Sequence, residues 1–401
     1  MTTIVLLGTL DTKGTEYEFL RDRVRQLGAE TVLVDVGTGG QPAVPGDISA
    51  TQVAEAAGHQ LADLTDRGQA MAAMGEGAEM ICRGLLADGR LDGLIALGGS
   101  GGTYIATCAM RALPLGIPKV MVSTMASGDI GHYVGTSDIS MTYSVVDIAG
   151  LNSISMRILA NAAAAVVAAA RVELPERAAR PTVAASMYGV TTPGVTRARA
   201  RLEELGYEVV VFHANGAGGR SLEAFARARS LVGVLDLTTT ELADELAGGI
   251  LSAGPDRLDA AGQAGLPQVV SLGALDMITF GPLETLPEEM RGRNICMHNP
   301  GVTVVRTTPG ECRDLGRLIG RKLSRARGRV AVFVPLRGTS QISVLGGPFY
   351  DPEADRALLD GLHDTLGPSV EVTELDTDIN DEAFALATAN RLHDFIQEVT
   401  P

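Results

Sequence analysis

Positions 98–102 read Gly-Gly-Ser-Gly-Gly and follow an apolar run that is typical of a buried strand. Glycine has no Cβ, so a ligand can approach the backbone N–H groups of such a segment closely. We expect a helix to begin at Thr103, and its N-terminal end would direct partial positive charge at the same place. The candidate phosphate-binding residues are therefore Gly98, Gly99, Ser100, Gly101, Gly102 and Thr103. The alternative is a tight turn from strand to helix that binds nothing.

This segment matches no standard nucleotide-binding motif. A dinucleotide fingerprint would have its third glycine where Tyr104 stands, and a P-loop would continue with a lysine. A nicotinamide-dependent dehydrogenase is therefore the weaker interpretation. Asp35, at the end of the second predicted strand, is consistent either with a ribose ligand or with a hydrogen-bonded turn residue.

Thr9, Asp11 and Lys13 follow the first predicted strand and are the next candidate cofactor-binding residues. The Lys13 ammonium is a point charge suited to a polyphosphate, although a solvated residue in a first helical turn would look the same. Asp11 and Asp129 are candidate Mg²⁺ ligands, directly or through water. Ser127 and Gly128, which precede Asp129, are included in the predicted cofactor site.

The candidate acid–base residues also follow predicted strands. Asp129 and His132 lie three positions apart, while His213 and His298 belong to the second half of the chain. Each has an alternative interpretation as a turn or hydrogen-bonding residue. Further polar residues expected at strand ends are Asn215, Asp236, Thr238, Thr239, Thr240, Asn299, Arg306 and Glu311.

Composition excludes some classes of partner. The 401 residues carry a net charge of −15, which disfavours nucleic acid and anionic membrane surfaces as ligands. The most apolar run, 158–170, is too short to span a bilayer. The four cysteines show no metal-ligand spacing, and the chain opens directly on a predicted strand without a signal peptide. We therefore expect a cytoplasmic protein.

Strand and helix patterns alternate along the whole chain and predict the elements that position these residues. The first half predicts strands at 3–7, 31–36, 91–97, 117–122 and 139–146, with a helix after the loop 8–14 and another over 148–171. The proline-containing segment 174–181 is the predicted linker. The second half predicts a second alternation that includes a helix over 222–231 and a strand over 302–307. The fold class is thus α/β, with two doubly wound, mainly parallel, Rossmann-like domains at 1–175 and 182–401 and a cleft between them.

Seven short motifs occur in an order that resembles a known family. They are Gly8-Thr-Leu-Asp-Thr-Lys-Gly14, Gly98-Gly-Ser-Gly-Gly-Thr103, Ser123-Thr-Met-Ala-Ser-Gly-Asp129, His213-Ala-Asn-Gly216, Asp236-Leu-Thr-Thr-Thr-Glu-Leu242, His298-Asn-Pro300 and Phe349-Tyr-Asp-Pro-Glu-Ala-Asp355. Together they resemble the ATP-binding domain family of the plant tobamovirus-resistance proteins and their bacterial and fungal relatives. The resemblance covers essentially the whole chain and implies two α/β domains, an ATP site and a dimer, but no particular reaction.

Two functions are consistent with these patterns. One is an enzyme that uses ATP and Mg²⁺ to act on a small polar metabolite between the domains. The other is a non-catalytic module that presents an ATP-dependent surface to a protein partner. Polar residues at strand ends in both halves favour the enzyme. The small residues of 161–170, together with the resemblance, predict a homodimer.

Overall fold

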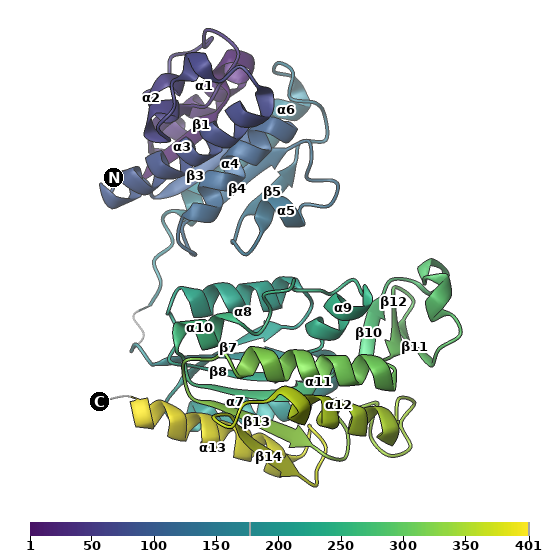
Figure 1. Cartoon of the computed structure of the whole chain (residues 1–401). Helices are drawn as coiled ribbons and strands as arrows, with labels where there is room; N and C mark the ends of the chain where they lie inside the picture. The colour runs from purple at the N-terminus through teal and green to yellow at the C-terminus, as the bar shows by residue number, and fades with distance from the viewer. Residues whose placement is uncertain (176–177, 400–401) are drawn as a thin grey trace. The chain divides into compact units, whose positions relative to one another are not determined.

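The computed structural model describes residues 1–175 and 178–399, which form two compact units divided between 176 and 177 (Figure 1). Both contain a parallel sheet covered by helices on its two faces, as the alternating patterns predict. The two doubly wound, Rossmann-like α/β folds expected from the sequence are thus confirmed. Within the described ranges, no helix has the length and apolarity needed to cross a membrane.

The N-terminal unit contains a five-stranded sheet in the order β2-β1-β3-β4-β5, with every neighbouring pair parallel. Its strands are β1 Thr3–Gly8, β2 Glu30–Asp35, β3 Gly93–Gly98, β4 Lys119–Ser123 and β5 Ser140–Tyr143. Its helices are α1 Leu10–Gln26, α2 Ala50–Ala56, α3 Arg67–Ala87, α4 Ser100–Ala112, α5 Gly131–Val134 and α6 Ser153–Ala169. The strand order reverses between β1 and β3, which is where doubly wound sheets bind their ligands.

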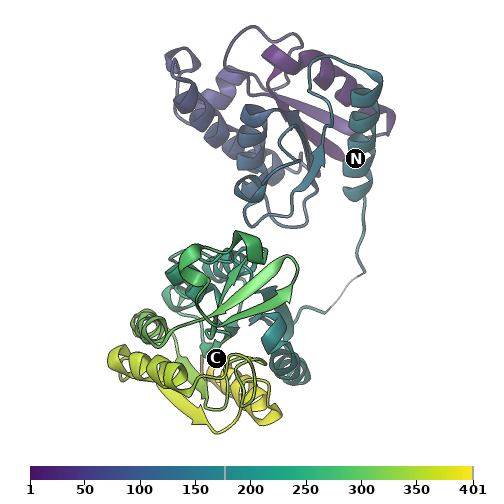
Figure 2. The same cartoon turned by 90° about the vertical axis from the view of Figure 1, so that its right-hand side faces the viewer.

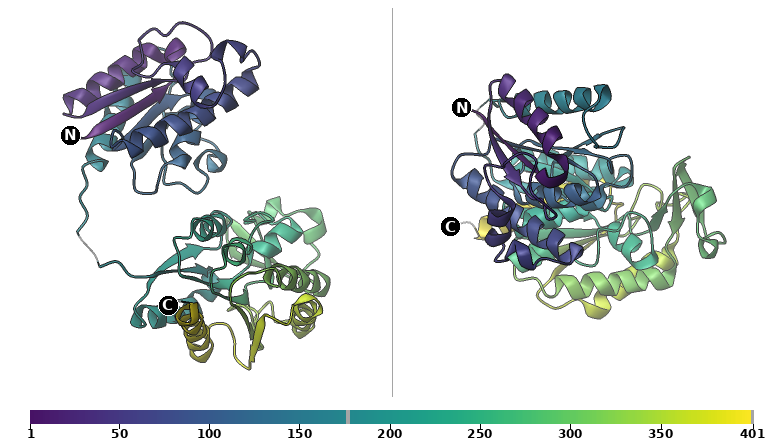
Figure 3. Two further views of the ribbon diagram at one scale, coloured as in Figure 1. Left: turned by 60° about the vertical axis from the view of Figure 1, so that its left-hand side comes forward. Right: turned by 90° about the horizontal axis from the view of Figure 1, so that it is seen from above.

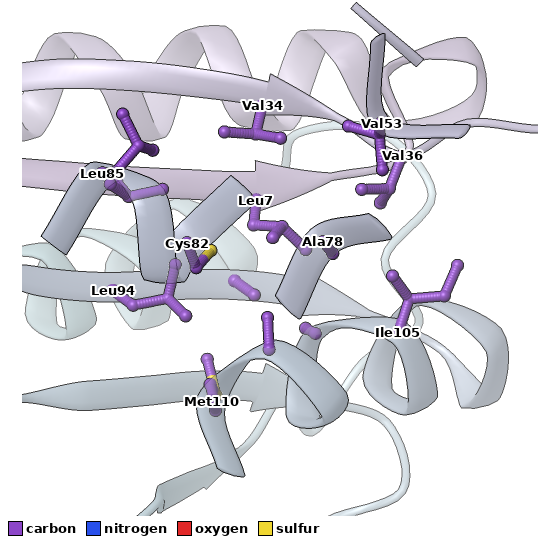
Figure 4. Packing of buried hydrophobic residues seen from close by; sticks show 14 of the residues in the cluster. Leu7, Val34, Val36, Val53, Ala78, Cys82, Leu85, Leu94, Ile105 and Met110 are labelled. Atoms are coloured by element: carbon purple, nitrogen blue, oxygen red, sulfur yellow. The ribbon is translucent and has the colours of Figure 1, made fainter. Parts of the chain in front are cut away.

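Alternate residues of the buried strands face opposite helical layers. On one face, Leu7 and Val34 pack with Cys82 of α3 and with Ile105 and Met110 of α4 (Figure 4). The other face packs against α1 and α6. This two-sided burial accounts for the continuous apolar runs that identified the strands.

Tyr17 of α1 joins β1 to β3 at the point where the two strands separate. Its hydroxyl donates to the Leu7 carbonyl at 2.5 Å and accepts from the Leu97 N–H at 2.9 Å. A Cβ on Gly8 would lie 1.9 Å from the Tyr17 ring, so this position requires glycine. The buried tyrosine therefore replaces the missing ladder bonds and fixes the spacing of the two loops that follow β1 and β3.

The C-terminal unit contains a six-stranded parallel sheet in the order β14-β13-β9-β8-β6-β7. The strands are β6 Thr182–Met187, β7 Glu208–His213, β8 Gly233–Thr238, β9 Gln268–Gly273, β13 Val330–Pro335 and β14 Glu371–Leu375. The helices are α7 Thr192–Glu204, α8 Ala217–Arg227, α9 Glu241–Ala247, α10 Ala260–Ala264, α11 Pro309–Leu323, α12 Pro352–Thr365 and α13 Glu382–Val399. One face packs on α7 and α13; α11 and α12 lie side by side on the other (Figure 3).

A separate antiparallel sheet in this unit departs from the predicted topology. It contains β10 Met277–Phe280, β12 Val302–Arg306 and β11 Ile295–Asn299, in that spatial order (Figure 2). The strand expected over 302–307 therefore exists but does not belong to the parallel sheet. Its partners β10 and β11 are short, and β11 ends in exposed polar residues, so neither has the apolar run that marks a parallel strand.

Several helix starts also differ from the expectation. α4 begins at Ser100 rather than Thr103, α1 begins at Leu10, α8 begins at Ala217 rather than 222, and α6 begins at Ser153 rather than 148. The N–H groups of a first helical turn have no intrahelical acceptor. Turn-forming residues are therefore tolerated there, and their composition hides the start of the helix.

Candidate functional site

A cavity of about 360 Å³ lies at the carboxyl ends of β1 and β3, at the point where the strand order of the N-terminal sheet reverses. It is lined by Thr9, Asp11, Thr12, Lys13, Thr38, Gly39, Arg67, Met71, Gly98, Gly99, Ser100, Gly101 and Gly102. The loop after β1 and the glycine segment after β3, which are far apart in the sequence, thus form one site. This is the position at which open α/β sheets bind ligands.

The N-terminus of α4 contributes unpaired backbone donors to this cavity. Gly99 is the N-cap and provides no side-chain acceptor. The N–H groups of Ser100, Gly101 and Gly102 have no acceptor among the described residues, and the first helical bond runs from Thr103 N to Gly99 O at 2.9 Å. Three amides and the positive end of a 13-residue helix are suited to an anion.

Gly101 keeps this end of the helix accessible. A Cβ on Gly101 would lie 2.5 Å from the terminal methyl of Met71 and 3.8 Å from the Arg67 guanidinium. Both neighbours belong to the first turns of α3. A larger side chain at 101 would therefore be accommodated only by moving Met71 within the cavity wall.

Two cations lie on the cavity wall. Lys13 is half-buried where α1 is kinked (φ −127°, ψ 20°), and its ammonium donates to the Ile148 carbonyl. Two of its three donors are still available for a ligand. Arg67, the first residue of α3, was not predicted from the sequence, because nothing local to 67 indicates that α3 begins beside the glycine segment.

Asp11 supplies the carboxylate of this cavity. Its Oδ2 accepts from the Gly39 N–H at 2.9 Å, whereas its buried Oδ1 has no partner among the described residues. Asp35, the other acid considered near the first loop, is buried and accepts from the N–H groups of Leu10 at 3.1 Å and Gly37 at 2.9 Å. Asp35 therefore acts as a turn residue that holds the start of α1, and burial raises the pKa of its carboxyl.

The structure does not bring every predicted cofactor residue to this cavity. Thr103 is fully buried, with its hydroxyl 2.7 Å from that of Ser123, so it supports α4 from behind. The other predicted residues outside the cavity wall are Ser127, Gly128, Asp129 and His132, all of them exposed. Asp129 Oδ1 accepts from the Gly131 N–H at 2.9 Å, and the His132 ring lies on that of Tyr133, with 3.9 Å between centroids. Neither side chain lines this cavity.

A second cavity, of about 320 Å³, lies in the C-terminal unit. It contains the two predicted histidines, His213 at the end of β7 and His298 on β11, together with Asn215 and Asn299. The rest of its wall, which the sequence did not indicate, consists of Tyr188, Gly189, Val190, Ile250, Leu251, Met277, Thr279, Cys296, Val302, Val304 and Ile342. These residues come from the antiparallel sheet and from three separate connecting segments, which explains why no local pattern identified them.

Other polar residues predicted at strand ends are structural. Asp236 binds the buried Arg257 guanidinium through two contacts of 2.5 and 2.7 Å, and Thr238, Thr239 and Thr240 are fully buried. Arg306 bonds Asp355 at 2.6 Å, while Glu311 caps α11 and pairs with Arg293. In the described residues, no group of three or more His, Cys, Asp or Glu side chains could hold a metal ion.

Comparison with known families identifies the chain. Residues 2–175 match the N-terminal domain model, and residues 180–396 the C-terminal domain model, of the uncharacterised protein family UPF0261. The chain belongs to the UPF0261 family. A UPF0261 protein from Clostridium tetani is 49% identical over 98% of this chain and 99% of its own length.

The UPF0261 chain is also similar to the plant proteins expected from its motifs. It is 38% identical to the tomato ToMV resistance protein Tm-1(GCR237) over 99% of this chain but only 56% of the tomato protein, so the plant chain is much longer. Among solved structures, a UDP-N-acetylglucosamine 2-epimerase from Rickettsia bellii covers 67% of this chain and 78% of its own at 10% identity. The TM-score of 0.24 is too low for any conclusion from that likeness.

Proposed function

We propose that this UPF0261 protein binds ATP with Mg²⁺ in the cavity of the N-terminal unit and uses it in a reaction on a small metabolite. The observation that carries the proposal is the free N-terminus of α4, which opens into a cavity at the reversal point of the sheet. The cytoplasmic location and the homodimer expected from the sequence belong to the same proposal.

Each wall residue has a distinct role in this proposal. The amides of Ser100, Gly101 and Gly102 would hold phosphate oxygens, and Lys13 and Arg67 would balance their charge. Asp11 fits Mg²⁺ better than Asp129, because it lines the cavity and has one oxygen without a partner. Mg²⁺ commonly uses one or two carboxylates together with substrate phosphates, so a protein cage is not required. ATP, when bound, would supply a phosphoryl or nucleotidyl group to activate the second substrate.

The second cavity supports an enzyme rather than a module that only binds nucleotide. It is concave and mostly apolar, with a few polar groups, which is the usual composition of a small-molecule site. A module whose sole task is to present an ATP-dependent surface does not need such a cavity. ATP binding without ATP consumption in the presence of any metabolite would favour the module.

Gly101→Val is expected to weaken ATP binding at least tenfold, equivalent to about 1.4 kcal/mol. The new side chain displaces Met71 into the cavity and covers the free amides, while the fold persists because Met71 is flexible. Isothermal titration calorimetry with ATP measures the effect. Gly84→Val is the matched control, since a Cβ on Gly84 of α3 meets nothing within 4 Å. Equal affinity of the two variants would contradict the phosphate site.

Asp11→Asn is expected to abolish the enhancement of ATP affinity by Mg²⁺ without weakening the binding of metal-free ATP. Loss of the anion removes a metal ligand and also reduces repulsion of the phosphates. Asp129→Asn should retain the full enhancement, because Asp129 lies outside the cavity wall. Titrations with and without Mg²⁺ distinguish the two carboxylates. The assignment is wrong if only Asp129→Asn removes the metal effect.

A further inference from the structure

The C-terminal cavity lies at the adjoining carboxyl ends of β6 and β7. Met187 and His213 are register partners at these ends, and the Ala214 N–H donates to the Met187 carbonyl at 2.8 Å. The His213 ring lies beside that of Tyr188, with 5.4 Å between centroids. β6 pairs with β7 on one side and with β8 on the other. The cavity therefore adjoins the reversal point of the C-terminal sheet, where open α/β sheets bind ligands.

Four groups of the wall at these strand ends can donate hydrogen bonds that the fold does not use. The N–H groups of Gly189 and Val190 have no acceptor among the described residues. The His213 ring has no hydrogen-bond partner in the same part of the chain. Asn215 accepts from the Gly218 N–H at 3.1 Å through its Oδ1, which leaves its own amide group free to donate. This end of the cavity thus offers donors from two neighbouring segments.

The chemistry of these donors favours a phosphate group. The described lining residues include no Asp or Glu, so no carboxylate of the wall competes for the donors. They include no Lys or Arg either, and the imidazole is the group at these strand ends that can add positive charge. Four donors match the three terminal oxygens of a phosphate monoester better than the two oxygens of a carboxylate. Consecutive free backbone amides are also a common way to bind phosphate.

The rest of the cavity is suited to an apolar body. Thr279, Val304 and Cys296 form one row across the antiparallel sheet and line the cavity floor. The Thr279 hydroxyl is engaged by the side chains of Asp244 and Tyr188, so it leaves the floor largely apolar. The volume of about 320 Å³ accommodates a body of about one ring beside the phosphate.

We infer that the C-terminal cavity binds a phosphate monoester with a compact apolar body. The phosphate accepts from the N–H groups of Gly189 and Val190 and from the side chains of His213 and Asn215, and the body packs on the floor of the antiparallel sheet. This ligand rests on the proposed function only where it is taken as the second substrate. Binding itself does not require ATP in the N-terminal unit.

Calorimetry on the full chain with phenyl phosphate, inorganic phosphate and benzoate tests the inference. The chain carries Gly101→Val to suppress phosphate binding in the N-terminal unit. The measurement is made at pH 6, where Asp244, the carboxyl that contacts Thr279, mostly keeps its proton. Phenyl phosphate is expected to bind at least tenfold more tightly than inorganic phosphate, which lacks the body, and than benzoate, which has fewer oxygens. Equal or tighter binding of benzoate, or no binding of phenyl phosphate, overturns the inference.

Gly189→Pro locates the binding, because it removes one free amide while the fold is kept. Proline is favoured at the first position of a helix, the preceding Tyr188 is extended (φ −135°, ψ 161°), and a Cβ on Gly189 meets nothing within 4 Å. Affinity for phenyl phosphate should fall at least tenfold. Ser153→Pro is the matched control: Ser153 is the exposed first residue of α6, follows the extended Asn152 (φ −139°, ψ 174°) and lies outside the cavity wall.

A second variant separates the amide from the added carbon atoms. Gly189→Ala adds a Cβ but keeps the N–H, so it should lose less affinity than Gly189→Pro. Equal affinities in Gly189→Pro and Ser153→Pro would contradict the site. ATP titrated into wild type and Gly101→Val tests the N-terminal nucleotide site separately. If ATP does not bind but phenyl phosphate binds and responds to Gly189→Pro, the proposed function fails and this inference stands; the reverse result overturns the inference alone.

Discussion

Replacing Arg257 by methionine is expected to destabilise the C-terminal unit by about 3–5 kcal/mol, because it leaves buried carboxylates without their cation. Arg257 is fully buried and contacts Asp236 at 2.5 Å, Glu241 at 2.7 Å and Glu223 at 3.4 Å. Glu241 in turn holds the start of α8, and Glu223 accepts from the N–H groups of Leu258 and Ala260. One cation therefore supports the start of α8 and the segment that leads into α10.

Differential scanning calorimetry of wild type and variant provides the measurement. Only the unfolding temperature of the C-terminal unit should fall, because none of the partners of Arg257 lies in the N-terminal unit. Arg199→Met is the matched control: Arg199 of α7 is half exposed and pairs with Glu203 at 2.6 Å on the surface, where such a pair contributes less than about 1 kcal/mol. If Arg257→Met loses as little stability as the control, the buried carboxylates take up protons with only a small loss of folding free energy.

Asp244→Asn is expected to stabilise the protein at pH 8 by on the order of 2–4 kcal/mol and to have almost no effect near pH 4. Burial, together with the negative charge of Glu241, raises the pKa of Asp244 to about 7, although hydrogen bonds from the Thr279 N–H and from its side chain act in the opposite direction. The asparagine carbonyl can keep the bond from the Thr279 N–H, and its amide can donate to the Thr279 hydroxyl, which already interacts with the Asp244 carboxyl.

The sign follows from proton uptake. Between about pH 4 and pH 7 the folded protein keeps the Asp244 proton that the unfolded chain has already released. Stability from this group is therefore complete at low pH and is lost as pH rises through 7. Urea unfolding of wild type and variant at pH 4, 6 and 8 measures the difference, with the exposed Asp256→Asn as control. A difference that does not change with pH would contradict the raised pKa.

Local patterns account for the elements that were predicted well. The strands predicted at 3–7 and 31–36 correspond to β1 and β2 to within one residue at each end. Their apolar runs consist of residues within a few positions of one another. The short strand β10 was missed because its pairing partner β12 lies beyond the segment 281–301, and short strands are specified by such pairing. The strand β11 is followed closely by β12, but it was missed because it ends in exposed polar residues and has no apolar run.

The candidate sites also contain some residues that local sequence reveals and others that only tertiary packing brings to a cavity. The glycine segment 98–102 was recognisable because the exposure of its backbone is a property of its own residues. Arg67 and Thr279 were not recognised, since each reaches its cavity only through the packing of another element. Asp236 was expected to face a ligand, but its polarity serves the buried Arg257 instead.

The sequence by itself determined the alternation of strands and helices, because apolar periodicity and glycine-rich strand ends are properties of residues close together in the chain. It also determined that polar groups would gather at the carboxyl ends of parallel strands. Only the tertiary structure decided the strand order that joins the loops after β1 and β3, and which polar residues face a cavity rather than a buried partner. Those outcomes depend on contacts between residues far apart in the chain, and the free energy of burying a charge is set by whatever the fold places beside it.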